Sequence, residues 1–559
     1  MEKTSMSPSP STDLVEHVDP VAHSDVKPTL PNADIDQEHQ LTFRDAWKHH
    51  KAIIGWSFFW AMCAIGWFAL LSGTVVFKAN QSKGVRCSSQ WSDDQRTILQ
   101  ARFWVSRIHL PRKENLAFVD NCHRYIFEGE AVLPASWQAA FNIISAVGQF
   151  LGGFCCSWVA DKTGRKPSLA VGILLCTGAI IGQIVTTSKV GFLISKLILG
   201  IGLGFYLTLG PLMCSEITPV VLRGISTAGV NLGIAVGQLI SNSVIKGFGE
   251  RTDRWAYRGP FAIQLFFAAF LAAGLAFSPE SPWYLVRVGK IEKARKSLQR
   301  LYGNNTDISA KLAGMETTVH EESMQKAPSF IDCFRGTDLL RTGISTGVFA
   351  CQHFVGIIFV LGYSTYFFQL AGLDTAHSFD LGVGVTACGV LGNFCSWFIV
   401  NSYGRRKIFV FGMVALTILL FLIGIMDVIP SSAAKWVQAS ATVIYAFVYF
   451  MTVGAMAFVI LGEASSAQLR ARTTALATAT QALFGIAMNF AIPYMVNPDK
   501  GNMKGKVGFV FGGLAAIATL GSFFYVPELK GRTFGEIDRM FYNRVPPRKM
   551  GGYQIEEEL

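Results

Sequence analysis

Long apolar runs alternate with short polar loops along most of this chain. The first run covers about residues 52 to 77, and eleven more begin near residues 136, 168, 191, 225, 260, 342, 380, 407, 436, 473 and 507. At about 1.5 Å of helix rise per residue, a run of about 20 residues crosses a hydrocarbon core of about 30 Å. The pattern therefore predicts an all-α polytopic membrane protein with twelve transmembrane helices.

The second half of the chain repeats landmarks of the first half. The Gly-Arg pair that ends at Arg165 returns 240 residues later at Arg405, and Glu216 returns 247 residues later at Glu463. The Pro-Glu pair that ends at Glu280 returns 248 residues later. Nearly constant offsets indicate a duplication. The twelve helices are therefore predicted to form two six-helix halves, related by an axis along the membrane normal.

The division of the chain follows from this repeat. Residues 1–50 are rich in Pro, Ser, Asp and His and contain no apolar run, which predicts a disordered cytoplasmic tail. The basic stretch before the seventh run shows helical periodicity over residues 290–302 and separates the two halves. The predicted parts are the tail 1–50, the first half 51–278, a cytoplasmic linker with helices 279–341, the second half 342–526 and a cytoplasmic tail 527–559.

Residues 78–133, between the first two runs, do not fit the positive-inside rule. The segment should lie outside the cell, yet it contains nine Lys or Arg residues against six acids, and its pattern is neither helical nor stranded. The second half has no counterpart to it. We interpret it as an insertion or as translated sequence such as a retained intron. The alternative is an authentic extracellular subdomain, with Cys87 and Cys122 as a possible disulfide pair.

Composition supports a membrane protein and argues against other classes. The 559 residues are 51% hydrophobic and 16% charged, with a mean hydropathy of +0.36. The net charge of +11 comes from Lys and Arg residues that cluster between the apolar runs, which indicates a positive-inside bias rather than nucleic-acid binding, and places both termini in the cytoplasm. The eleven cysteines have no metal-ligand spacing, and no nucleophile–base set is present. We therefore expect no enzyme activity, no metal and no cofactor.

Acidic and basic residues recur at the ends of the apolar runs in both halves. The positive-inside rule alone could account for any one of them. The repeated spacing of a Glu followed seven residues later by an Arg indicates that the charges also interact with one another. We expect a ring of exposed ion pairs on the inner face, each contributing about 0.2 to 1 kcal/mol, that latches the two halves and opens again. Its predicted members are Asp161, Arg165, Lys166, Glu216, Arg223, Arg405, Arg406, Glu463 and Arg470.

These loops resemble the motifs of the major facilitator superfamily, and within it the sugar porters. The family's D-x-x-G-R-[RK], G-R-R, P-x4-E-x2-P-x3-R-G, P-E-S-P and P-E-x-K-G-R-T motifs fall on residues 161–166, 404–406, 211–224, 279–282 and 527–533. The stretches 251–258, 279–286 and 362–368 look most like fungal α-glucoside permeases of the maltose type. The resemblance implies a plasma-membrane transporter that works by alternating access as a monomer in the lipid bilayer. It also implies a sugar, such as an α-glucoside, as substrate and symport with a proton.

The same resemblance implies residues that contact the substrate. The family's sugar-binding Gln of the fifth span falls on Gln238, and the first Gln of the seventh-span pair falls on Gln352; the alternative for each is a helix–helix hydrogen bond. The second Gln of that pair is His353 here. The tenth span ends its motif in Phe458 instead of Trp, and the eleventh keeps Asn489. These departures predict a larger and more apolar pocket, which favours a disaccharide, a glycoside or a substrate that is not a sugar.

Proton coupling has less support from the residues. Proton-coupled relatives place an Asp in the first span, whereas this chain has no acid between Asp45 and Asp93. His353 could titrate instead, although a lone histidine in a span is more often a packing residue. Export of a hydrophobic metabolite is the alternative to sugar uptake. A sugar receptor that does not transport is a further alternative, but only about 33 residues follow the last span, too few for the long signalling tail of such receptors.

Overall fold

The structure is a computed structural model. It describes residues 51–62, 126–127, 130–131, 135–186, 188–249, 255–303, 307–323, 329–362, 375–466, 468–496, 501 and 503–554. The predicted disordered tail 1–50 lies outside these residues, as do Cys87, Cys122 and most of the segment 78–133.

One short part of that segment corrects the sequence prediction. Strands β1 (Ile126–Phe127) and β2 (Glu130–Ala131) pair antiparallel, so the expectation of a segment without strands is wrong at this point. Two residues per strand form too small a ladder for an alternating pattern to show in the sequence.

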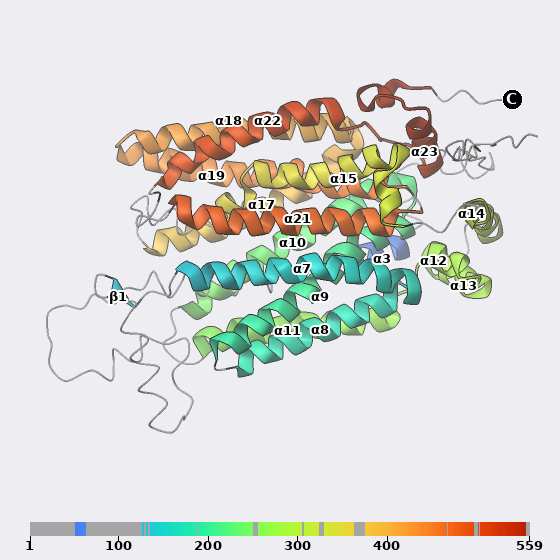
Figure 1. The fold of residues 1–559 in the computed structure, drawn as a ribbon, viewed down its shortest axis with the longest axis horizontal. Helices are drawn as coiled ribbons and strands as arrows, with labels where there is room; N and C mark the ends of the chain where they lie inside the picture. The colour runs from blue at the N-terminus through green and yellow to red at the C-terminus, as the bar shows by residue number, and fades with distance from the viewer. Residues whose placement is uncertain are drawn as a thin grey trace, which may run out of the picture.

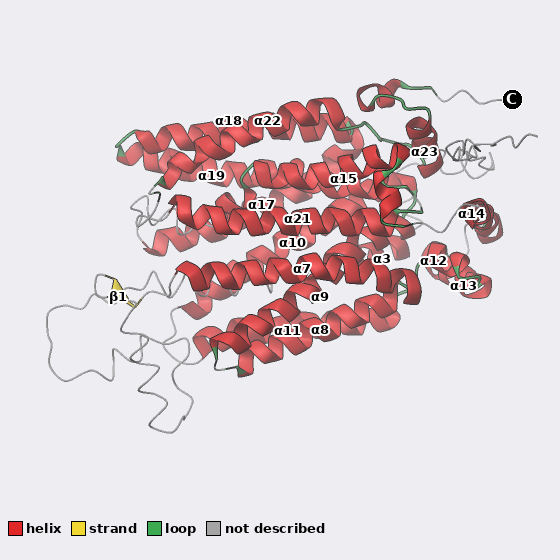
Figure 2. Cartoon of the chain, viewed as in Figure 1, coloured by secondary structure: helices red, strands yellow, loops and turns green. Residues whose placement is uncertain are grey.

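The described residues of the first half form six helices. The long ones run side by side in Figures 1 and 2. The six helices are α3 (Lys51–Met62), α7 (Ala135–Thr163), α8 (Arg165–Val185), α9 (Lys189–Ile217), α10 (Val220–Gly249) and α11 (Trp255–Phe277). Glycines let α7 and α9 pack closely: a Cβ on Gly148 would lie 2.3 Å from Leu197 O, and one on Gly200 would lie 2.2 Å from Ser145 O. The glycines of the fourth span therefore serve helix packing.

The second half repeats this arrangement with one helix broken. It contains α15 (Gly336–Phe354) with the π-helical turn η4 (Ile358–Gly362), α17 (Thr375–Tyr403), α18 (Arg405–Val428), α19 (Ser432–Met451), α20 (Val453–Ala464), α21 (Arg470–Val496) and α22 (Val507–Tyr525). The break at Thr452 divides the tenth span into α19 and α20, and every residue of α20 is buried.

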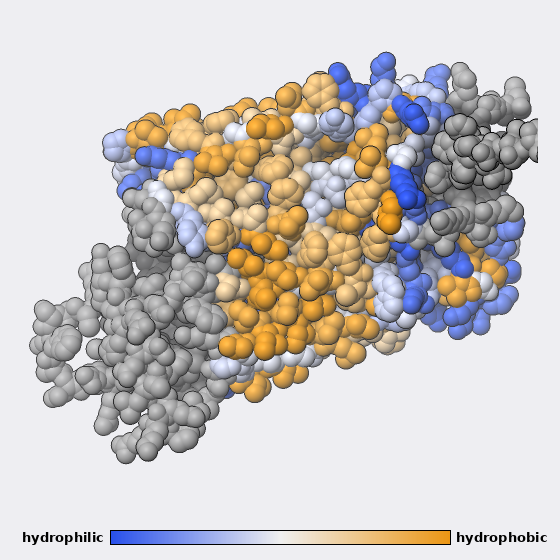
Figure 3. Space-filling view, in the orientation of Figure 1, coloured by the Kyte–Doolittle hydropathy of each residue, from blue (hydrophilic) through white to orange (hydrophobic). Residues whose placement is uncertain are grey.

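The count of spans agrees with twelve as far as the described residues allow. Ten segments of the described chain are long and apolar enough to cross a membrane, with α19 and α20 counted as one segment. Helices α3 and α15 occupy the first and seventh places, and the chain that follows residues 62 and 362 lies outside the description. An apolar band covers the middle of the molecule in Figure 3, as expected for a surface that faces lipid.

Short helices gather at one end of the bundle, on the right of Figure 1. They are α12 (Pro282–Arg287), α13 (Ile291–Tyr302), α14 (Ile308–Ser323) and η3 (Ile331–Phe334) between the halves, and α23 (Phe534–Tyr542) with η6 (Pro547–Gly552) after the last span. The helix predicted over residues 290–302 is therefore confirmed as α13. We call this end, which carries Gly164 and Gly404, the motif end.

The two halves meet along two pairs of helices. Helix α7 packs against α21, and α10 packs against α17. Helix α10 also contacts the buried α20, so residues of α10, α15 and α20 converge at the centre of the molecule. This convergence positions the candidate site.

Candidate functional site

Gly164 forms the turn between α7 and α8 at the motif end. Its φ of 105° and ψ of 173° belong to a region that is accessible almost only to glycine, and a Cβ there would lie 2.9 Å from a Glu280 oxygen. Glu280 accepts hydrogen bonds from the backbone N–H groups of Arg165 at 3.0 Å and Lys166 at 3.1 Å. Its carboxylate thus caps the positive end of the α8 dipole. Burial raises the pKa of the Glu280 carboxyl, and the backbone N–H groups oppose that rise.

The side chain of Arg165 turns inward from this cap and binds Glu216 of α9. Its Nη2 lies 2.8 Å from Glu216 Oε1 and its Nε lies 3.2 Å from Oε2, a bidentate pair. The remaining Nη1 donates to Ala160 O at 3.1 Å. Both side chains are almost fully buried, at 3% and 2% exposure.

The second half reproduces this arrangement contact by contact. Gly404 has φ 88°, and Glu528 accepts from the backbone N–H groups of Arg405 at 2.8 Å and Arg406 at 3.2 Å. The Arg405 guanidinium binds Glu463 at 2.8 and 3.0 Å. Its Nη1 donates to the carbonyl of residue 400, five positions earlier, as Arg165 does to Ala160. The duplication therefore preserves a complete set of interactions.

The predicted ring of exposed ion pairs is wrong on two counts. The pairs Arg165–Glu216 and Arg405–Glu463 are buried, and each joins helices of one half instead of bridging the two halves. Breaking a buried pair leaves an uncompensated charge and costs about 3 to 5 kcal/mol. Such pairs hold each half together and are too costly to open in every transport cycle.

Lys166 and Arg406, the last residues of the two G-R-[RK] motifs, are only partly buried. Arg406 donates to the carbonyls of Phe523 at 2.6 Å and Val526 at 2.7 Å, and so ties the start of α18 to the end of α22. The described residues include an ion pair between the two halves, Asp161–Arg472, and neither Lys166 nor Arg406 takes part in it.

Contacts between the halves at the motif end use other partners. Asp161, at the end of α7, lies 3.2 Å from Arg472 of α21. The guanidinium carbons of Arg223 of α10 and Arg470 of α21 lie 3.6 and 3.7 Å from the ring centroid of Phe534, so both arginines contact the same ring. Helix α23 thereby inserts an aromatic side chain between one arginine of each half. The halves are closed against each other at this end.

Helix α23 is itself fixed to the second half. Arg341 of α15 forms an ion pair with Asp538 at 2.5 Å and lies 4.9 Å from the Phe541 ring, while its Nε donates to the carbonyl of Ala464. A capping box at Thr533 and Glu536 starts the helix. The position of Phe534 therefore follows from contacts along the whole of α23.

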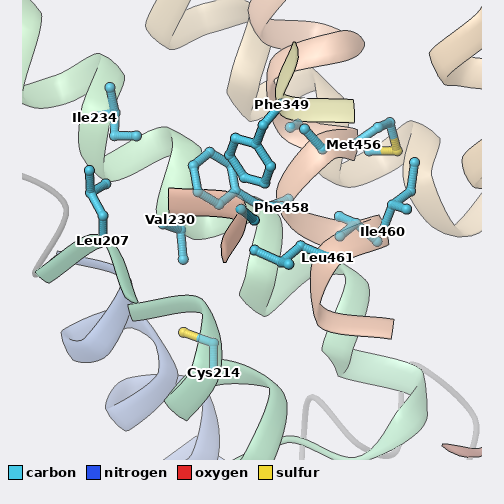
Figure 4. Close-up of a cluster of buried hydrophobic side chains, with 14 of the residues drawn as sticks. Leu207, Cys214, Val230, Ile234, Phe349, Met456, Phe458, Ile460 and Leu461 are labelled. Carbon is cyan, nitrogen blue, oxygen red and sulfur yellow. The ribbon is translucent and has the colours of Figure 1, made fainter. Parts of the chain in front are cut away.

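An apolar cluster closes the centre of the molecule next to these contacts (Figure 4). Phe349 of α15 meets Phe458 of α20 edge to face, with ring centroids 5.1 Å apart. Val230 of α10 and Leu207 of α9 face them from the first half. This cluster of side chains from α9, α10, α15 and α20 joins both halves, and we call it the plug. Phe458, predicted to contact substrate, lies in this plug and is buried to 2% exposure.

Polar side chains lie next to the plug on its side away from the motif end. Gln352 Nε2 donates to Gly454 O at 3.3 Å. A Cβ on Gly454 would lie 2.9 Å from Asn231 Nδ2 of α10, an amide that has no hydrogen-bond partner among the described residues. Gln352 and Asn231, from opposite halves, therefore approach the same glycine.

The other predicted substrate residues differ in their surroundings. Gln238 is buried in α10, and its Oε1 has no partner in the described part of the chain. His353 stacks on Phe484 with 6.1 Å between ring centroids; its nitrogens make no hydrogen bond of regular geometry to described residues, although the backbone of Gln481 is near. Asn489 donates to Gly485 of its own helix and is only partly buried. Gln238 and His353 thus hold unused hydrogen-bonding capacity, whereas Asn489 does not depend on a ligand.

Several residues of the site were not predicted as members. Glu280 and Glu528 were recognised as landmarks of the repeat, and their constant offset was the signal that could have assigned them to the site. Arg472 and Phe534 gave no such signal, because their partners lie in other helices. Lys196 is a buried lysine of α9 that lies 5.7 Å from the Phe192 ring, and its charge inside an apolar run was a signal. Among the described residues, no His, Cys, Asp and Glu side chains converge as a metal site requires.

Comparisons with known proteins agree with one another. The family model described as "Sugar (and other) transporter" matches residues 50–541. The general alpha-glucoside permease of Saccharomyces cerevisiae is 30% identical over 438 residues, which are 77% of this chain and 71% of that protein, and the maltose permease MAL31 of the same yeast is 29% identical over 437 residues with the same coverage. The solved structure of the proton:xylose symporter XylE bound to 6-bromo-6-deoxy-D-glucose has a TM-score of 0.68 at 21% identity and covers 88% of this chain and 99% of its own.

Proposed function

Because the chain belongs to the family of sugar and other transporters, we propose that it is a secondary active importer of an α-glucoside such as maltose, which works by alternating access. The observation that carries the proposal is the approach of Asn231 and Gln352, from opposite halves, to Gly454, with the unpartnered Oε1 of Gln238 buried in the same helix as Asn231. The α-glucoside and maltose permeases of yeast, at about 30% identity, support this class of substrate. We place the motif end and both termini in the cytoplasm of a plasma-membrane protein, because basic residues concentrate there.

The contacts suggest which parts move. The buried pairs Arg165–Glu216 and Arg405–Glu463 keep each half rigid. The Asp161–Arg472 pair joins the halves through partly exposed side chains, and the Phe534 clamp, the contact of the Phe534 ring with Arg223 and Arg470, joins them through two buried arginines. An ion pair of this kind and each cation–π contact contribute about 0.2 to 2 kcal/mol, so these contacts separate at a cost of a few kcal/mol. Opening toward the cytoplasm requires that Asp161 leave Arg472, that Phe534 leave one arginine and that Phe349 separate from the first half.

Sugar hydroxyls fit the unused polar atoms of the central site. Gln238 Oε1 accepts hydrogen bonds, and Asn231 Nδ2 donates them. A buried polar atom without a partner costs free energy that a bound hydroxyl recovers. Gln352 is satisfied by Gly454 O and would exchange that bond for one to the substrate. The stacked rings of His353 and Phe484 offer an apolar face to a pyranose ring.

Coupling to protons is the second part of the proposal. XylE, similar in fold, is a proton symporter. The described part of α3 carries no acid, so a carboxylate in the first span does not support coupling here. Of the titratable side chains of the described spans, Lys196 is buried without a carboxylate partner among the described residues, and His353 lies in the central site. These two are the candidates that a mutational test of coupling should address first.

Uptake of labelled sugars in a transporter-deficient host tests the proposal. Expressed protein should accumulate maltose or another α-glucoside against a gradient, and a protonophore should abolish accumulation. Facilitated equilibration that is insensitive to the protonophore would refute the coupling alone. Absence of uptake for every glucoside, together with increased resistance of the host to apolar toxins, would instead establish export of a hydrophobic compound.

A further inference from the structure

Two arginines of the second half share one aromatic ring where α22 ends. The guanidinium carbon of Arg406 lies 5.4 Å from the centroid of Phe523, and that of Arg548 lies 4.9 Å from the same centroid and 5.4 Å from Phe524. Arg548 belongs to η6, which returns the chain to the end of α22. Two like charges are therefore held near each other by contacts with neutral aromatic rings.

The charge of Glu528, the acid nearest in the motif, acts on Arg406, but backbone N–H groups occupy its carboxylate oxygens. Glu528 Oε1 accepts from the backbone N–H groups of Arg405 and Lys530, and Oε2 accepts from that of Arg406. Arg548 is exposed, and within the described chain its side chain makes no hydrogen bond or ion pair. Arg406 is fixed by two carbonyls, which leaves three of its five N–H groups for another acceptor. Free donors of both side chains are therefore available to an anion.

The first half carries the same basic pair. Lys166 lies 240 residues before Arg406, the offset of the G-R motifs, and Arg300 lies 248 residues before Arg548, the offset of the Pro-Glu motifs. The charge of Arg300 acts on Lys166 as that of Arg548 acts on Arg406. The G-R loop and a second basic residue beside it therefore occur in both halves. The aromatic side chains occur only in the second half, because the positions that match Phe523 and Phe524 are Leu275 and Ala276.

The surroundings of the pair in the second half mark a membrane boundary. Phe523, Phe524 and Tyr525 are 42%, 45% and 61% exposed at the end of the last span. Exposed aromatic side chains at the end of a span are typical of the interface between hydrocarbon and headgroups. An anion that reaches Arg406 and Arg548 therefore does so at headgroup level, next to apolar rings.

The geometry points to a binding site for the phosphate of an anionic phospholipid headgroup, held by Arg406 and Arg548, with Phe523 and Phe524 against the glycerol and upper acyl chains. Guanidinium groups bind phosphate with two parallel hydrogen bonds. The same chemistry would admit free phosphate, but the exposed rings favour a ligand that is partly apolar. The site is separate from the central polar residues and from the contacts between the halves.

Lipid binding to the full-length protein in nanodiscs tests the site. The variant is Arg548→Gln, and Lys549→Gln is the matched control, because it removes the same charge from the neighbouring exposed position. Affinity for phosphatidylserine in a phosphatidylcholine background should fall at least tenfold for R548Q and less than threefold for K549Q, with uptake in a neutral bilayer unchanged in both. A second variant, Phe523→Leu, should lower the affinity while the net charge stays the same.

Three results would overturn the proposal. Equal losses for R548Q and K549Q would show a diffuse attraction to negative lipid without a defined site. Competition by millimolar inorganic phosphate would assign the site to a soluble anion. Unchanged affinity in both R548Q and F523L would remove the pair from lipid binding altogether. None of these results depends on which sugar the protein transports.

Discussion

At the scale of single residues, two glycines explain why the same turn between spans recurs in both halves of the chain. Gly164 and Gly404 adopt φ values of 105° and 88°, and each lies against a glutamate that caps the next helix. Any side chain would both strain the backbone and displace that glutamate. The glycine, the cap and the buried arginine therefore form one structural unit, present twice.

Gly404→Ala should destabilise the protein by about 1 to 3 kcal/mol, because its backbone conformation is accessible almost only to glycine. A Cβ would also lie 2.3 Å from Glu528 Oε2. Thermal unfolding in detergent should show a lower midpoint for this variant. Gly513→Ala, in α22 with open space around its Cβ, is the matched control and should not lower the midpoint. Equal midpoints for both variants would contradict the strained-turn argument.

Gln238→Ala tests the central site. Loss of one hydrogen bond to substrate should raise the apparent KM up to about tenfold, with kcat changed less. Gln183→Ala is the control: Gln183 is also buried without a described partner, but it lies in α8, which packs on α7, α9 and α11. Its KM should stay at the wild-type value. An unchanged KM for Gln238→Ala would remove that residue from the site.

At the scale of elements, α23 is the helix that connects the motif end to the gate. Sequence alone marks it only as the segment after the P-E-x-K-G-R-T motif. In the structure its first residue, Phe534, lies between Arg223 and Arg470, and its later residues bind Arg341. A helix outside the membrane thus stabilises the closed arrangement of the spans.

Phe534→Ala should shift the equilibrium toward the state that is open to the cytoplasm. The closed state has one more cation–π contact than the open state, and losing that contact of about 0.5 to 2 kcal/mol corresponds to at least a twofold change in population. Alkylation of a cysteine placed at Thr208, which is buried opposite Thr478 in the closed state, reports that opening. Phe534→Tyr keeps an aromatic ring and should react as slowly as the protein with native Phe534. Slow alkylation of the alanine variant would show that the clamp does not hold the gate.

At the scale of the whole molecule, sequence predicted the family, the all-α fold, the repeat and the starts of most spans, and the structure and comparisons confirm them. Apolar runs and constant offsets are local signals that need no partner. The pairing of charges was not predictable in this way, because Arg165 and Glu216 are 51 residues apart and the sequence does not state that both are buried. The plug position of Phe458 likewise depends on how α15 and α20 meet.

The ion pair Asp161–Arg472 breaks the symmetry of the duplicated halves. The positions that correspond by the repeat offsets are Asn401 and Ile225, so the second copy of this contact carries no charge. The pair joins α7 to α21 only, with side chains 32% and 19% exposed. A single partly exposed pair of this kind stabilises the closed state by less than about 1 kcal/mol, which suits a contact that opens in every cycle.

A charge swap tests this contact. Asp161→Arg or Arg472→Asp alone places like charges together and should raise alkylation at Thr208→Cys several-fold, whereas the double variant Asp161→Arg with Arg472→Asp should return it to within about twofold of the parent. The control is the same charge exchange in Lys246 and Asp380, an exposed pair between α10 and α17 at the opposite end. It should leave the alkylation rate at Thr208→Cys equal to that of the parent. If the double variant reacts as fast as the single ones, the two charges act independently and the contact is not part of the gate. Recovery in the double variant, with uptake restored in parallel, would show that the asymmetric pair biases which side of the transporter is open.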